Sequence, residues 1–74
     1  MQKWEYLQIH VESSKGRLLV SVNGHGVADK KEFSDMAGLM GYLNSLGAEG
    51  WEMVNAHRNE YGFQNYFFKR PIKE

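Results

Sequence analysis

The stretch LNSLGAEGWEMV, residues 43–54, decides the fold because the spacing of apolar residues changes from helical to strand-like within it. Upstream, apolar side chains recur at the spacing of one helix face: Met36, Leu39, Met40, Leu43 and Leu46. Gly47 is a residue type that ends helices in a left-handed conformation, and Gly50 allows the chain to reverse. We predict one amphipathic helix that ends at Gly47 and is capped at its start by Ser34 or Asp35, with a strand directly behind it. An earlier start at a capping box of Asp29 and Glu32 is the less favoured alternative.

Four segments alternate in character from one residue to the next, as strands do: Trp4 to Glu12, Arg17 to Val22, Trp51 to Arg58 and Phe63 to Lys69. The order β-β-α-β-β predicts an α+β fold with a four-stranded antiparallel sheet, in which strand order 2-1-3-4 is favoured and the helix covers one face. This order puts the two tryptophan-bearing strands in the centre and the last strand at an edge. The segment 23–34 is left undetermined, apart from a turn at Asn23-Gly24-His25-Gly26.

The composition describes a single domain over residues 1–74. The chain has no cysteine, and nine Lys and Arg balance nine Asp and Glu, so the formal net charge is zero and general attraction to nucleic acid is disfavoured. A chain of this length buries only about 60% of the surface of its unfolded form, which favours self-association. No segment approaches the roughly 20 apolar residues of a membrane span and no secretion signal is evident, so we expect a cytoplasmic protein.

Both faces of the predicted sheet carry large apolar side chains, whereas one helix can cover only one face. The expected helix side has Leu7, Ile9, Val11, Val54 and Ala56, and the expected outer side has Trp4, Tyr6, Trp51 and Met53. Leaving such aromatic residues in water would forfeit much of a small domain's stability, which is roughly 5–15 kcal/mol. We therefore predict a homodimer or higher homo-oligomer that buries the outer side. The alternatives are that segment 23–34, a ligand or another protein covers the outer side.

A small-ligand site is expected where the outer side turns polar, since subunit interfaces form concave pockets. The candidates are Gln8, His10, Asn55 and His57, with Arg58 as an anion contact. His10, His25 and His57 lack metal-ligand spacing, and pairing Trp4 opposite His57 would separate His10 and His57 by about 20 Å at ~3.3 Å per residue. No metal or cofactor is predicted. No nucleophile with an adjacent base is evident, so we predict a non-enzymatic module.

Binding of single-stranded nucleic acid is the alternative function. Basic residues of the last third, including Arg58 and Lys73, are interleaved with aromatic ones, and aromatic strands with flanking bases can stack single strands. The residues that would form this surface are Tyr66, Phe68, Lys69 and Arg70. The zero net charge and the absence of the aromatic signature of an RNA-recognition sheet count against this function.

Three blocks, KWEY at 3–6, LNSLGAEGWEMV at 43–54 and FFKRP at 67–71, resemble the bacterial domain of unknown function family 4177. The central block is the most specific, because it combines a helix cap, a turn and a strand start in a fixed register. The resemblance implies a small prokaryotic α+β domain with no established activity, so it transfers no catalytic residue. The stretch 23–26 departs from the shorter connections associated with that family.

Overall fold

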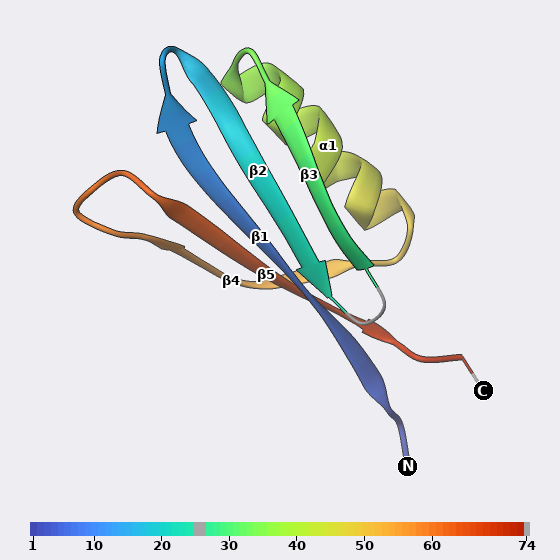
Figure 1. Ribbon diagram of the computed structural model, residues 1–74. Helices are drawn as coiled ribbons and strands as arrows, with labels where there is room; N and C mark the ends of the chain where they lie inside the picture. The colour runs from blue at the N-terminus through green and yellow to red at the C-terminus, as the bar shows by residue number, and fades with distance from the viewer. Residues whose placement is uncertain (25–26, 74) are drawn as a thin grey trace.

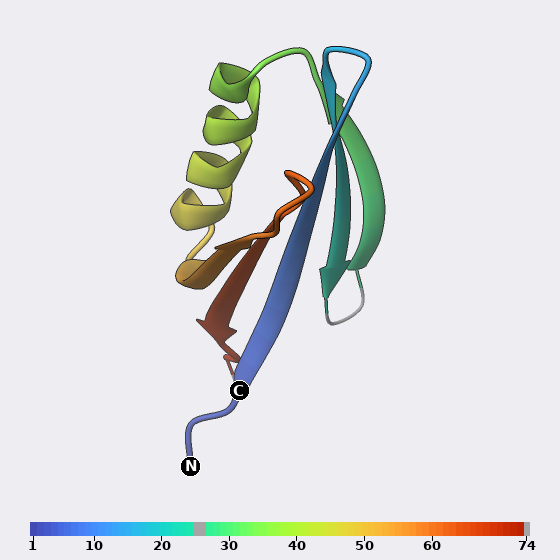
Figure 2. The same ribbon diagram turned by 90° about the vertical axis from the view of Figure 1, so that its left-hand side faces the viewer.

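A computed structural model describes residues 1–24 and 27–73 (Figure 1). In chain order the elements are β1 (Trp4–Ser14), β2 (Arg17–Gly24), β3 (Val27–Phe33), α1 (Met36–Ala48), β4 (Glu52–Arg58) and β5 (Gln64–Pro71). The strands form one antiparallel sheet of order β3-β2-β1-β5-β4, and α1 packs on one face of it (Figure 2). The predicted α+β class, single helix and antiparallel sheet are confirmed, but the sheet has five strands instead of four and the order 2-1-3-4 is wrong.

The segment that the sequence leaves undetermined contains the additional strand, β3. It pairs antiparallel with β2, from Leu18 opposite Phe33 to Gly24 opposite Val27. Because β3 reverses the chain once more before the helix, α1 connects the two edge strands β3 and β4, which run in the same direction. Of the predicted turn, Asn23 and Gly24 continue β2, whereas His25 and Gly26 lie outside the described residues.

The positions of the last two strands are the reverse of the predicted ones. β5 lies between β1 and β4, and its Phe68 is buried as the Cα partner of both Leu7 and Met53. Every residue of β4 is exposed, so this strand forms the edge. The central position goes to the strand with large apolar side chains on both of its faces, since a central strand is flanked on both sides and removes more of them from water.

The core lies between α1 and the side of the sheet that faces it. Leu39, Leu43 and Leu46 of α1 pack on side chains from β1, β2, β5 and the start of the β4 segment: Leu7, Ile9, Val11, Val20, Val22, Phe68 and Trp51. The predicted burial of the three β1 residues is confirmed, whereas Val54 and Ala56 of β4 are exposed, contrary to the prediction.

The ends of α1 are closed by local hydrogen bonds. At the start, the Asp35 side chain accepts a hydrogen bond from the Gly38 N–H at 2.9 Å, as an N-cap does, so one of the two predicted caps is confirmed. At the end, the helix runs past Gly47 to Ala48, and the left-handed residue is Gly50 (φ 92°). The predicted stop at Gly47 is therefore wrong.

The residues after α1 form a Schellman motif that fixes the direction of the returning chain. The Trp51 N–H donates to the Leu46 carbonyl at 3.0 Å, and the Gly50 N–H donates to the Gly47 carbonyl at 3.0 Å. This motif typically brings the side chain behind the glycine onto the last turn of the helix. Trp51 accordingly packs in the core, with 9% of its surface exposed.

A β-bulge in β4 interrupts the alternation of its side chains. Met53 and Asn55 are the Cα partners of the consecutive residues Phe68 and Phe67, which leaves Val54 as an extra residue. Odd-numbered residues of β4 therefore point to one face of the sheet before the bulge and to the opposite face after it.

The bulge separates side chains that the sequence analysis assigns to one face. Trp51 and Met53 lie on the helix side, whereas Asn55 and His57 lie on the opposite side of the sheet. The prediction that Trp51 and Met53 belong to the outer side is wrong. A strict two-residue period contains no sign of an extra residue, and one such residue transfers all later side chains to the other face.

Candidate functional site

The outer face, which is the surface of the sheet opposite α1, is the candidate functional site. Its aromatic end consists of Trp4, Tyr6 and Phe67, which are 39%, 61% and 36% exposed. The register of the strands places all three on this face, because Tyr6 is opposite Lys69 and Gln8 is opposite Phe67. Segment 27–33 forms β3 in the plane of the sheet, and among the described segments none crosses the outer face in Figure 2. Coverage of this face by segment 23–34 is thus contradicted for its described residues.

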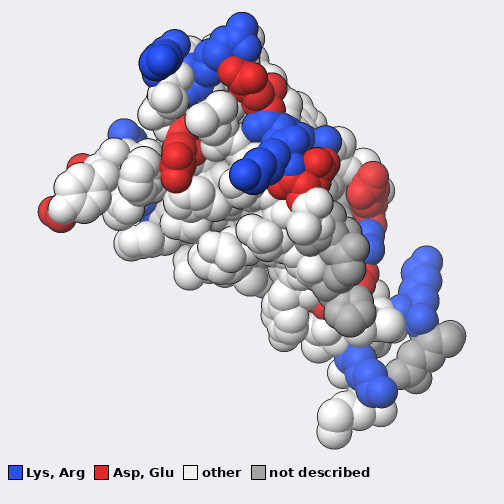
Figure 3. All heavy atoms as spheres, in the orientation of Figure 1, with Lys and Arg blue, Asp and Glu red and all other residues white. Residues whose placement is uncertain are grey.

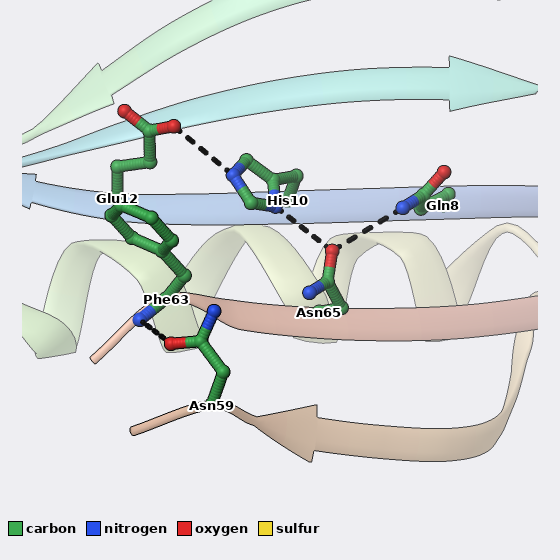
Figure 4. A network of polar contacts seen from close by, with 6 residues as sticks. All are labelled: Gln8, His10, Glu12, Asn59, Phe63 and Asn65. Atoms are coloured by element: carbon green, nitrogen blue, oxygen red, sulfur yellow. Dashed lines mark hydrogen bonds and ion pairs between the residues drawn. The ribbon is translucent and has the colours of Figure 1, made fainter. Parts of the chain in front are cut away.

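A polar cluster of Gln8, His10, Glu12 and Asn65 lies on the outer face (Figure 4), and the register of β1 and β5 places it next to the aromatic end. The Asn65 Oδ1 accepts a hydrogen bond from the Gln8 Nε2 at 3.2 Å and lies 2.9 Å from the His10 Nδ1. The other ring nitrogen of His10, Nε2, lies 3.2 Å from the Glu12 Oε1. Both imidazole nitrogens therefore face oxygen acceptors, and the protonated ring can donate to both.

The surroundings of His10 favour its protonated form. The hydrogen bond with Asn65 is the main cause that raises the pKa of His10 above its ordinary value of 6.5. Burial of the ring acts in the opposite direction, and the hydrogen bond and negative charge of Glu12 raise the pKa further. In its protonated form the His10 ring thus lies between two acceptors, on the same face as the aromatic end.

The turn between β4 and β5 positions an aromatic ring against this cluster. The Asn59 Oδ1 accepts hydrogen bonds from the Tyr61 and Phe63 N–H groups at 2.9 and 3.0 Å, and Gly62 supplies a positive φ of 86°. The ring of Phe63 is thereby held with its centre 5.8 Å from that of His10 (Figure 4). The turn is part of the outer-face architecture.

The structure brings together four of the five predicted ligand residues on this face. Gln8 and His10 belong to the polar cluster, while Asn55 and His57 lie on the far side of β5. His57 and His10 are both Cα partners of Asn65, so their Cα atoms are about 10 Å apart, two strand spacings, in place of the predicted 20 Å.

Sequence reasoning assigned Arg58 to the wrong face and missed Asn65, which lies at the centre of the polar cluster. Arg58 is paired with Gln64, which places it on the helix side and outside the predicted site. Asn65, which accepts both central hydrogen bonds, was missed by sequence reasoning. The sequence feature that could have identified Asn65 is a polar side chain at a position that shares its face of the strand with Phe67. The described residues contain no group of three or more His, Cys, Asp or Glu that could hold a metal ion.

The two tryptophans belong to different faces and have different cationic partners. Lys69 Nζ lies 4.3 Å from the centre of the Trp4 ring on the outer face. On the helix side, the Arg70 guanidinium carbon lies 4.1 Å from the centre of the Trp51 ring, and Arg70 Nε donates to Glu5 Oε1 at 2.6 Å. Trp4 is therefore available at the surface, whereas Trp51 is part of the core.

The residues named for nucleic-acid binding do not form one surface. Lys69 lies on the outer face, whereas Tyr66, Phe68 and Arg70 lie on the helix side. Phe68 is buried and Arg70 is paired with Glu5, so neither side chain is placed to stack on a base.

No protein-family model matches this chain, and the comparisons with curated proteins and with solved structures also found no match. The resemblance to domain family 4177 stays a prediction. Among the described residues, no helix has the length and apolar character needed to cross a membrane.

Proposed function

We propose that the protein is a homo-oligomeric interaction module in which the outer face of one copy packs against the outer face of a second copy. The observation that supports this function most strongly is the aromatic end, where Trp4, Tyr6 and Phe67 lie together and stay more than one-third exposed. A small domain that leaves such residues in water loses a large part of the stabilisation available to it. Self-association recovers that stabilisation.

The dimensions of the outer face suit a second copy of the same chain. Five strands spaced about 4.8 Å apart, with about eight residues each at ~3.3 Å, present roughly 600 Å² in flat projection. Side-chain relief increases the accessible area, which brings it near the 800 Å² or so that each partner contributes to a standard interface. A two-fold axis lets the same patch serve on both copies.

The charge distribution is compatible with such packing. The net charge is zero, so two copies carry no overall repulsion. Figure 3, which views the outer face, shows charged side chains gathered along β3 and over the end of the β1–β2 hairpin, with a largely uncharged band across the middle. An interface core depleted in charge is typical of protein–protein contacts.

The polar cluster is also compatible with burial in an interface. Gln8, His10 and Glu12 have partners within their own chain, so covering them leaves few unsatisfied polar atoms. We assign the cluster a positioning role in the interface instead of a catalytic one.

The test compares two tyrosines that differ in location. Tyr6→Glu places a charge in the aromatic end, whereas Tyr61→Glu places one in the β4–β5 turn, where Tyr61 is 77% exposed. We expect sedimentation equilibrium to show self-association of the wild type, at least a tenfold weaker association for Tyr6→Glu, and no change for Tyr61→Glu. Circular dichroism would confirm that both variants are folded. A wild type that stays monomeric at high concentration, or equal behaviour of the two variants, would contradict the proposal.

A further inference from the structure

The two edges of the sheet differ in charge. β3 carries four consecutive charged residues, Asp29 to Glu32, whereas β4 has no Asp, Glu, Lys or Arg between Met53 and His57. Charged side chains, lysine above all, are a common device that stops an edge strand from pairing with another chain. β3 is therefore protected by charge against such pairing, whereas the middle of β4 carries no such charge.

β4 is also exposed along its whole length. Each of its seven residues is exposed, and the apolar Met53 and Val54 are 45% and 48% exposed. An edge strand with free backbone groups and exposed apolar side chains is a template for one more strand.

We propose that β4 pairs antiparallel with β4 of a second copy, so that two five-stranded sheets join into one continuous sheet of ten strands. This surface is an edge, so the inference is independent of the outer-face packing proposed above. If both contacts form and their two-fold axes are perpendicular and intersect, the assembly is a tetramer of two face-packed sheets.

The side chains of β4 select one register for this pairing. Residues opposite one another across an antiparallel pair lie on the same face of the sheet. Glu52, Asn55 and His57 lie on the outer face, and Met53 and Ala56 lie on the helix side. When the two-fold axis passes beside Asn55 and Val54 stays the extra residue of the bulge, each of these residues lies opposite a residue on the same face.

In that register each contact across the junction is complementary. Asn55 faces Asn55 of the second copy, and Met53 faces Ala56 of the second copy. The Glu52 carboxylate faces the His57 imidazole of the second copy, and the two-fold axis makes this contact twice. A slip by one residue would place outer-face side chains opposite helix-side ones, so the register is specified.

Disulfide trapping tests the register directly, because the chain contains no native cysteine. Asn55→Cys puts two thiols opposite each other across the axis, at the Cα separation of about 4.5–5.5 Å that suits a disulfide. Ala28→Cys, at an exposed outer-face position on β3, is the matched control. Both are made in the Tyr6→Glu background, which removes the outer-face contact.

Under mild oxidation we expect the Asn55→Cys chain to form a covalent dimer at least ten times faster than the Ala28→Cys chain. Adding Glu52→Lys should slow this cross-linking, and adding His57→Glu to that variant should restore it by creating an opposite-charge pair in reversed order. Equal rates for the two cysteine variants would overturn the edge pairing. Fast cross-linking of Asn55→Cys combined with an unchanged association of Tyr6→Glu would uphold the edge contact and reject the outer-face contact.

Discussion

The two faces of β1 are built from alternate residues of one strand, yet they have different physical characters. On the helix side, Leu7, Ile9 and Val11 are buried. On the outer face, Tyr6 is exposed and His10 is held by hydrogen bonds to side chains. The helix side obtains its stability within one chain, whereas the outer face keeps apolar surface that a single chain does not cover. This difference places the folding core on one face and, under the proposed function, association on the other.

Truncation of a core residue should produce the largest difference between the faces. Leu39 is completely buried in α1, so Leu39→Ala should lower the free energy of unfolding by about 3 kcal/mol, from lost burial and the cavity left behind. Tyr6→Ala on the outer face should change it by less than about 1 kcal/mol per chain when association is suppressed by dilution. Urea denaturation measures both values. A larger loss for Tyr6→Ala would contradict the assignment of folding to the helix side.

The helix side was predictable because its pattern is local and regular. Leu7, Ile9 and Val11 alternate, Leu39, Leu43 and Leu46 follow the helical period, and all six are buried. Met36 and Met40 follow the same period but are 45% and 40% exposed, so spacing predicted most of the helix stripe and not all of it. The topology was not predictable in the same way. The charged segment 27–33 has the character of a loop, and its place in the sheet depends on pairing with β2 that no local pattern contains.

The outer face was predicted in part for a related reason. Trp4 and Tyr6 were assigned correctly because β1 is regular, whereas the bulge at Val54 and the Schellman motif behind α1 put Trp51 on the other side. Asn65 was missed because its role depends on β5 lying beside β1, which brings its amide to His10. Contacts in the site that depend on which strands are neighbours could not be predicted from the sequence alone.

Close packing on the helix side can be tested with two glycines. A Cβ added at Gly24 would lie 2.6 Å from Leu7 Cδ1 and 2.9 Å from the Tyr6 carbonyl oxygen, so Gly24→Ala should cost about 1–3 kcal/mol in stability. At Gly41, in α1, nothing lies within 4 Å of such a Cβ, so Gly41→Ala should stabilise the protein by up to about 1 kcal/mol. Thermal and urea unfolding report both signs. Destabilisation by both variants would show that close approach at Gly24 is not the cause.

The smallest expected effect is the pH dependence that His10 gives to the outer face. Its pKa is raised in the folded chain, so folding favours the protonated ring. The contribution of His10 to stability is therefore fully present below the ordinary histidine pKa of 6.5 and is lost as the pH rises through the raised value. The difference in unfolding free energy between the parent chain and His10→Gln should accordingly shrink between pH 5.5 and 8.5. Measuring it in the Tyr6→Glu background, at low protein concentration, separates this effect from outer-face association.

Two further variants locate the origin of this dependence. Because the hydrogen bond with Asn65 is the main cause of the raised pKa, Asn65→Ala should remove more of the dependence than Glu12→Gln does. The opposite ranking would mean that the charge of Glu12, and not the bond across the strands, holds the proton on His10. In that case the cluster would be an ion pair within β1, and the contact between β1 and β5 would have no part in its titration.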